Sequence, residues 1–325
     1  MLHIQIIVFA LSLLTSTSFA VPLPAGGLEA GQVVSVAPGQ TIGGNHNGPH
    51  PNKARPHIVL GEEHSTGNVV LAPVTAVEND PKLGPSVQHA EDYHDKLFGS
   101  IQLTHVTADP NVLPPPSYGG MKAFRGAVDE IKEKKQDAAV KVYDTAARAH
   151  NDASEAHQEA ADAHAKAAKH WQKLGQGVLA QDHSDKADQH EAAAADMRAG
   201  KKDMTRLANN AYKHNDKMTH PDYVAAQTAK DGADQSRRNA EQSQEHAETV
   251  VKLLRASVKS KEAAKVAGKA GDGETQKKLK NVVEHTTFQA AQHSPSNANK
   301  PDVEKSEKLA KDSKKEAKKV LKANK

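Results

Sequence analysis

The sequence predicts an all-α protein. We expect an elongated antiparallel bundle of three long helices and two shorter C-terminal helices, preceded by a disordered arm rich in Pro and Gly. Thirteen of the 16 Pro lie between residues 21 and 120, whereas none lies between Ser117 and His220. Ala, Lys, Glu, Gln and Asp dominate that Pro-free stretch, and most of them favour helix. Because Pro interrupts regular structure, the two parts should differ in order.

Residues 1–20 have the pattern of a signal peptide. An apolar run from Ile6 to Leu11 is followed by small residues at Ser18 and Ala20, which predicts cleavage after Ala20. A membrane anchor is the alternative, but the run is about half of the roughly 20 residues that a bilayer span requires. We therefore expect a secreted, extracellular protein. The chain has no Cys, so its stability should depend on helix packing.

Residues 21–120 are predicted to form a mostly disordered arm, with at most one short helix, Val87 to Phe98. Breakers are dense here, as in the run from Leu113 to Pro116. The arm carries four Lys and Arg against nine Asp and Glu. Its acidic charge contrasts with the basic remainder of the chain, and this contrast mainly favours solubility.

Residues 121–270 should form the Ala-rich antiparallel bundle. The expected long helices are Met121 to Leu174, Val178 to Thr219 and Asp222 to Ala267. They are separated by Gly175-Gln176-Gly177 and by His220-Pro221. Connections this short make consecutive helices antiparallel neighbours.

Residues 271–325 should form two shorter helices, Glu274 to Gln292 and Asp302 to Ala323, the second being a basic Lys-rich tail. A basic amphipathic helix can bind another protein or an anionic surface. The simpler interpretation, which we favour, is a solvated helix with salt bridges such as Glu304 to Lys308.

The apolar and small residues of the first two helices suggest a register for the hairpin. If Leu174 meets Leu179, then Ala160 lies opposite Ala193. The third helix would then bring a group of larger apolar residues to the hairpin tip, beside Trp171. These are Val250, Val251, Leu254 and Val258.

Histidine recurs every seven residues at His150, His157 and His164, the period of a coiled coil. Successive members lie about 10.5 Å apart along a helix, too far to share one metal ion. A site between helices would use His164, His170, His183 and His190, with His170 opposite His183 and His164 beside His190. We favour the interpretation that these residues are solvated and flank the seam, so no metal ligands are predicted.

The same register makes a prediction about pH. It places His157 opposite Asp196 and His150 opposite Asp203. A neighbouring carboxylate favours the charged imidazole, so we expect raised pKa values for both histidines. The bundle would then be more stable in mildly acidic than in alkaline solution.

The sequence indicates no enzyme and no cofactor, because it has no phosphate loop, zinc-protease motif or nucleophile elbow. The segment Trp171 to Gly175, with Ala187 and Ala194, resembles a single degenerate tetratricopeptide repeat. In composition, the helical part resembles late-embryogenesis-abundant proteins, which protect other molecules during drying. We expect a secreted interaction or structural protein, a class that includes secreted effectors of eukaryotic microbes. The alternatives are a metal- or proton-responsive His-rich binding protein and a hydrophilic stress protectant.

Overall fold

The computed structural model describes residues 28–37, 39–42, 53–63, 65–76, 86–92, 97–116, 125–214 and 218–323. It divides into two compact units, residues 1–134 and 135–325. The expected signal peptide, residues 1–20, lies outside the described residues. In the part that is described, no helix is both long enough and apolar enough to cross a membrane.

The helices follow the predicted pattern closely. They are α1 (Arg125–Lys173), α2 (Gly177–His214), α3 (His220–Lys269), α4 (Gly273–Gln292) and α5 (Val303–Ala323). Gly175 ends α1 in the left-handed region, at φ +72°, which Gly adopts without a Cβ clash. Thr219 caps α3 in a reciprocal capping box with Asp222. The breakers identified in the sequence therefore end and begin helices as expected.

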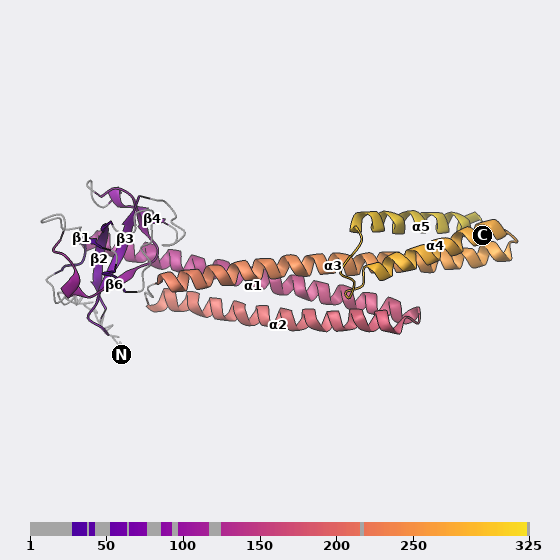
Figure 1. Cartoon of the computed structure of the whole chain (residues 1–325), viewed down its shortest axis with the longest axis horizontal. Coiled ribbons are helices and arrows are strands. Elements are labelled where there is room, and N and C mark those ends of the chain that lie inside the picture. Colours follow the sequence, from indigo (N-terminus) through magenta and orange to yellow (C-terminus); the bar gives the residue numbers. More distant parts are fainter. Residues whose placement is uncertain are drawn as a thin grey trace, which may run out of the picture. The chain divides into compact units, whose positions relative to one another are not determined.

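The long helix α3 takes part in two successive helical packings within the second unit (Figure 1). Its N-terminal half packs against α1 and α2, where Ala233 meets Ala149 and Ala153. Its C-terminal half packs against α4 and α5, where Ala264 contacts Leu279 of α4 and Ala317 of α5. The apolar stripe of the basic helix α5 is thus packed against its neighbours, with Ala317 buried and Val320 and Leu321 partly buried.

The hairpin tip between α1 and α2 forms the predicted apolar cluster. Trp171 is fully buried there against Val250 and Leu254 of α3, with Leu174 and Leu179 partly buried beside them. Large apolar residues are scarce in the helices, and several of them pack together at this tip. Val258 was expected in the same cluster but is 38% exposed.

The prediction of a disordered arm is wrong for the described part of residues 21–120, which forms an antiparallel sheet. Its strands are β1 (Val33–Val36), β2 (Arg55–Glu62), β3 (Val69–Thr75), β4 (Ser86–His89), β5 (Ser100–Gln102) and β6 (Val106–Ala108). They are ordered β1-β2-β3-β5-β4, and β6 also pairs with β3. Strand β4 occupies the start of the predicted helix from Val87 to Phe98. The chain is therefore mostly helical but not all-α.

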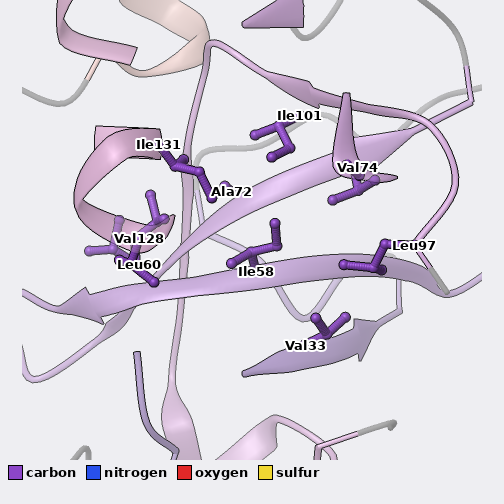
Figure 2. Packing of buried hydrophobic residues seen from close by; sticks show 11 residues of the cluster. Val33, Ile58, Leu60, Ala72, Val74, Leu97, Ile101, Val128 and Ile131 are labelled. Atoms are coloured by element: carbon purple, nitrogen blue, oxygen red, sulfur yellow. The ribbon is translucent and has the colours of Figure 1, made fainter. Parts of the chain in front are cut away.

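The central strands β2 and β3 are buried on both faces, so their sequence lacks the alternation that marks a strand. In β2, Ile58 and Leu60 pack into one apolar cluster while Val59 packs into the other. The first cluster also contains Val128 and Ile131 from the start of α1 (Figure 2). Strands buried on both faces read as short continuous apolar runs without the usual alternation. The frequent Pro in this region is typical of irregular structure, so the local pattern does not indicate a sheet.

Candidate functional site

The histidine stripe of α1 lies inside the bundle. His164 is 1% exposed and His183 of α2 is 0% exposed, and His157 and His190 are also buried. The interpretation that these residues are solvated is therefore wrong. Ala at the surrounding core positions leaves room for the rings. Buried ring nitrogens need hydrogen-bond partners, and each of these histidines contacts another histidine.

A first polar layer joins three helices. Nδ1 of His157 lies 2.8 Å from Nδ1 of His190, so one of these atoms donates and the other accepts. Nε2 of His157 lies 2.8 Å from Oγ of Ser236 on α3. The layer therefore links α1, α2 and α3 through side chains alone.

A second layer repeats the first one heptad away. Nδ1 of His164 lies 2.9 Å from Nδ1 of His183, and Nε2 of His164 lies 2.9 Å from Oγ of Ser243. Nε2 of His190 also lies 2.9 Å from the same hydroxyl. Ser243 thereby joins the layers into one chain, which we call the histidine network. Its members in order are Ser236, His157, His190, Ser243, His164 and His183.

A related pair occurs where α3 packs with α4 and α5. Nδ1 of His246 lies 2.8 Å from Nδ1 of His293, and Nε2 of His293 lies 2.9 Å from Oγ of Ser306 on α5. His293 is the C-cap residue of α4. The same His, His and Ser combination thus recurs in both helical packings.

The structure corrects the predicted hairpin register. His170 does not face His183, which pairs with His164, and His190 pairs with His157. The ring of His164 also stacks on that of His190, with centroids 5.6 Å apart. His170 is half-buried, and Arg255 lowers its pKa after the larger effect of burial. Leu174 and Leu179, the predicted anchor of the register, are both partly buried in the cluster that surrounds Trp171, which is fully buried.

Burial makes these imidazoles hard to protonate. Burial, followed by His183, His190, Lys186 and Lys300, lowers the pKa of His164 to about 3. Burial also lowers the pKa of His183 to about 4, with Asp182 opposing and Lys300 reinforcing the shift. Burial likewise lowers the pKa of His190 and of His293 to about 4. It also lowers the pKa values of His157 and His246.

The predicted raised pKa of His157 is therefore wrong. Asp196 and Asp203, the expected carboxylate partners, are both exposed. Burial lowers the pKa of His157, and the charged neighbour that adds to this effect is Lys186. Nδ1 of His150 donates a hydrogen bond to Ala146 O, at 2.9 Å, rather than to Asp203.

The geometry is that of hydrogen bonds rather than metal ligation. Facing nitrogens in the network lie 2.8–2.9 Å apart, whereas ligand nitrogens around tetrahedral zinc lie roughly 3.3 Å apart, given bonds near 2.05 Å. Of the four metal candidates, the structure brings together His164, His183 and His190. Within the described ranges, no group of three or more His, Asp or Glu is placed to hold an ion.

The sequence did not predict the two serines of the network. Ser236 and Ser243 stand seven residues apart on α3, matching the spacing of His157 and His164 on α1. This shared seven-residue spacing on α1 and α3 was the only signal for the two serines. It predicts a hydrogen bond only once the register of the two helices is known.

Comparison with protein families, curated proteins and solved structures gives no match to this chain.

Proposed function

We propose that this chain is a secreted, non-enzymatic interaction or structural protein whose helical bundle is closed at neutral pH and loosens in acid. Secretion is supported by the apolar run and small residues that precede residue 21. The acid response is supported by the buried hydrogen bond between His164 and His183.

This hydrogen bond requires at least one neutral imidazole. A neutral ring has one N–H donor and one acceptor nitrogen, whereas a charged ring has two donors. Protonating both rings of a pair would set two N–H groups against each other at 2.9 Å. It would also place positive charge in a core that is closed to water.

The charges around the network oppose protonation as well. Lys186 of α2 and Lys300 of the connection between α4 and α5 both lower the pKa of His164, after the larger effect of burial. Asp182 opposes this effect at His183. Its carboxylate is already engaged, since it accepts hydrogen bonds from Ser294 and Ser296. Protonation in acid should therefore destabilise the packing of α1, α2 and α3 at the network.

A helical bundle that changes compactness with pH can expose or hide binding surface without any catalytic group. The lysines of α5, already exposed in the closed bundle, offer a separate surface for an acidic partner, while its apolar stripe packs against the bundle. They are Lys305, Lys308, Lys311, Lys314, Lys315, Lys318, Lys319 and Lys322.

The test is the hydrodynamic radius and helix content of the chain from residue 21 onward, measured from neutral pH to about pH 4, near the folded-state pKa values of the network. We expect a cooperative thermal transition at neutral pH and an expanded chain that exposes apolar surface in acid. A compact bundle throughout the range would contradict the acid response. Absence of any cooperative transition at neutral pH would instead favour a disordered protectant.

A further inference from the structure

A pocket of about 510 Å³ lies beside the histidine network in the second unit. Its wall is formed by α2, by the middle of α3 and by the connection between α4 and α5. The lining residues are Lys186, Asn239, Gln242, Ser243, His246, Pro295, Asn297, Ala298 and Lys300. No carboxylate is among the described residues that line it. The pocket is therefore rich in cations and hydrogen-bond donors.

Two lysines line this pocket, and they lie near enough for Lys186 to lower the pKa of Lys300. Lys186 and Lys300 come from different elements and are each partly buried. Burial lowers the pKa of Lys300, and Lys186 lowers it further, with Asp182 opposing in part. Among the described residues, neither lysine forms an ion pair, and Lys186 donates only to Gln189. Asp182 offsets only part of this repulsion, because its carboxylate also accepts hydrogen bonds from Ser294 and Ser296. An anion between the two lysines would therefore be favourable.

The third wall of the pocket is fixed rather than loose. Asp182 of α2 accepts hydrogen bonds from Ser294 and from both the backbone and hydroxyl of Ser296. Asn297 donates 2.8 Å to Gln292 O, which closes the turn after α4. These contacts fix the connection that carries Lys300, one of the lining residues.

Neutral donors can also point into the pocket. Nδ1 of His246 is bonded to His293, while its Nε2 has no protein partner in the described ranges. If Ser306 donates to Nε2 of His293 and His293 donates from Nδ1, then His246 must carry its proton on Nε2. An anion would select this arrangement, because the reverse one turns a lone pair toward it.

Ser243 can contribute in the same way. Both His164 and His190 approach its oxygen with Nε2 at 2.9 Å. Nε2 of His183 is buried and has no partner among the described residues, and orphaned buried donors are rare. We therefore place the proton of His183 on Nδ1, so that His164 donates to Ser243. When His190 donates as well, the hydroxyl hydrogen of Ser243 is free for the pocket.

We propose that this pocket binds the phosphate of a small phosphate monoester, using Lys186 and Lys300 for charge and Ser243, His246 and the amides of Asn239 and Gln242 as donors. Two ammonium groups favour a dianion, and a phosphate monoester carries nearly two negative charges at neutral pH. A sulfate monoester has the same shape with one negative charge. The pocket is larger than one oxyanion, so it leaves room for the attached polar group. The site is independent of the acid response, since it needs only the pocket as folded at neutral pH.

The experiment titrates the full chain with inorganic phosphate, glucose 6-phosphate and glucose 6-sulfate at constant ionic strength. Binding is followed by calorimetry and by the imidazole ¹⁵N signals of His246. We expect glucose 6-phosphate to bind more tightly than the sulfate ester, and His246 to become protonated on Nε2 in the complex. Each of Lys186→Gln and Lys300→Gln should weaken binding roughly tenfold, whereas Lys202→Gln, an exposed lysine of the same helix, should not.

We expect the variants to fold, because removing either lysine relieves the repulsion by which Lys186 lowers the pKa of Lys300. Lys186→Arg and Lys300→Arg are charge-conserving controls, and both variants should retain binding because Arg keeps the positive charge. Equal affinity in the Gln variants and in Lys202→Gln would overturn the site. Tighter binding of the sulfate ester would overturn the phosphate assignment. Failure of binding with an intact acid transition would reject this site and leave the proposed function standing.

Discussion

His164 of α1 and His183 of α2 share a hydrogen bond between their Nδ1 atoms, 2.9 Å apart, with 1% and 0% of their surfaces exposed. This bond forms only while at least one ring is neutral. Because Nε2 of His164 is bound to Ser243, the pair also fixes α3. Protonation at this point thus affects the packing of α1, α2 and α3 together.

The first prediction is that stability increases with pH between about 4 and 6.5 and then levels off. The folded-state pKa values of His183 and His190 are about 4, below the unfolded value of about 6.5. The unfolded state therefore binds more protons inside this window, and stability is lost as pH falls through it. Each buried imidazole adds a slope of at most about 1.4 kcal/mol per pH unit.

Urea unfolding at several pH values measures this slope. His164→Gln combined with His183→Gln should reduce it, since neither amide titrates. His285→Gln alters an exposed histidine of α4 and should leave the slope unchanged. An unaltered slope in the double variant would show that this pair does not couple folding to protons.

The second prediction concerns Ser243, whose hydroxyl meets both His164 and His190. Ser243→Ala should destabilise the bundle by about 1–3 kcal/mol at neutral pH, because ring nitrogens are left unpaired in the core. Ser184→Ala, at a half-buried position of α2, should cost much less. Equal losses in chemical denaturation of the two variants would argue against the network.

The third prediction uses two helical glycines. A Cβ at Gly200 would lie 2.2 Å from Cδ2 of His150, whereas a Cβ at Gly232 would meet nothing within 4 Å. Gly232→Ala should stabilise the protein by about 0.5–1 kcal/mol through helix propensity. Gly200→Ala should destabilise it, because the ring of His150 must move and give up its bond to Ala146 O.

Thermal melts of the two variants, together with Gly200→Ala in a His150→Ala background, complete this test. Once the ring is removed, Gly200→Ala should become stabilising like Gly232→Ala. Stabilisation by Gly200→Ala in the parent chain would mean that α1 and α2 pack in another register.

The fourth prediction concerns the sheet. Leu71 of β3 is fully buried, whereas Val112 is 48% exposed. Leu71→Ala should cost about 2–5 kcal/mol and make the region from residue 53 to 76 sensitive to protease. Val112→Ala should have little effect. Rapid cleavage of this region in the parent chain would support the disordered arm that the sequence predicts.

The fifth prediction is that zinc does not raise the melting temperature at neutral pH. The facing nitrogens of His164 and His183 are already bonded to each other, and zinc would have to separate them and displace that bond. A native-only ligand would stabilise by mass action. A zinc-dependent rise that His164→Gln with His183→Gln abolishes would therefore favour the metal alternative.

The sequence predicts some parts of this structure well for physical reasons. Breakers such as Gly175 and Pro221 fix where helices end and begin. Trp171 and Leu254 meet because few other large apolar residues compete for burial. The register of the hairpin is harder to predict from the sequence, because the seam between α1 and α2 consists largely of Ala. Sliding α1 against α2 by about one turn replaces Ala contacts with other Ala contacts.

The remaining errors share one cause, which is that local patterns do not report burial. His164 reads as polar, but its partners on two other helices allow it to be fully enclosed. In β3, the run from Val69 to Val74 lacks alternation because both of its faces are covered, and it contains Pro73, which is typical of irregular structure. In both places, residues distant in the sequence determine whether a side chain is buried.

The most direct test of the central claim is the ¹⁵N NMR spectrum of the imidazole groups at about pH 5.5, where an unfolded histidine would be mostly protonated. The account predicts that His164, His183 and His190 remain neutral in the folded bundle, and that one Nδ1 of each bonded pair carries the shared proton. Charged imidazole signals for these residues in a fully folded chain would contradict it.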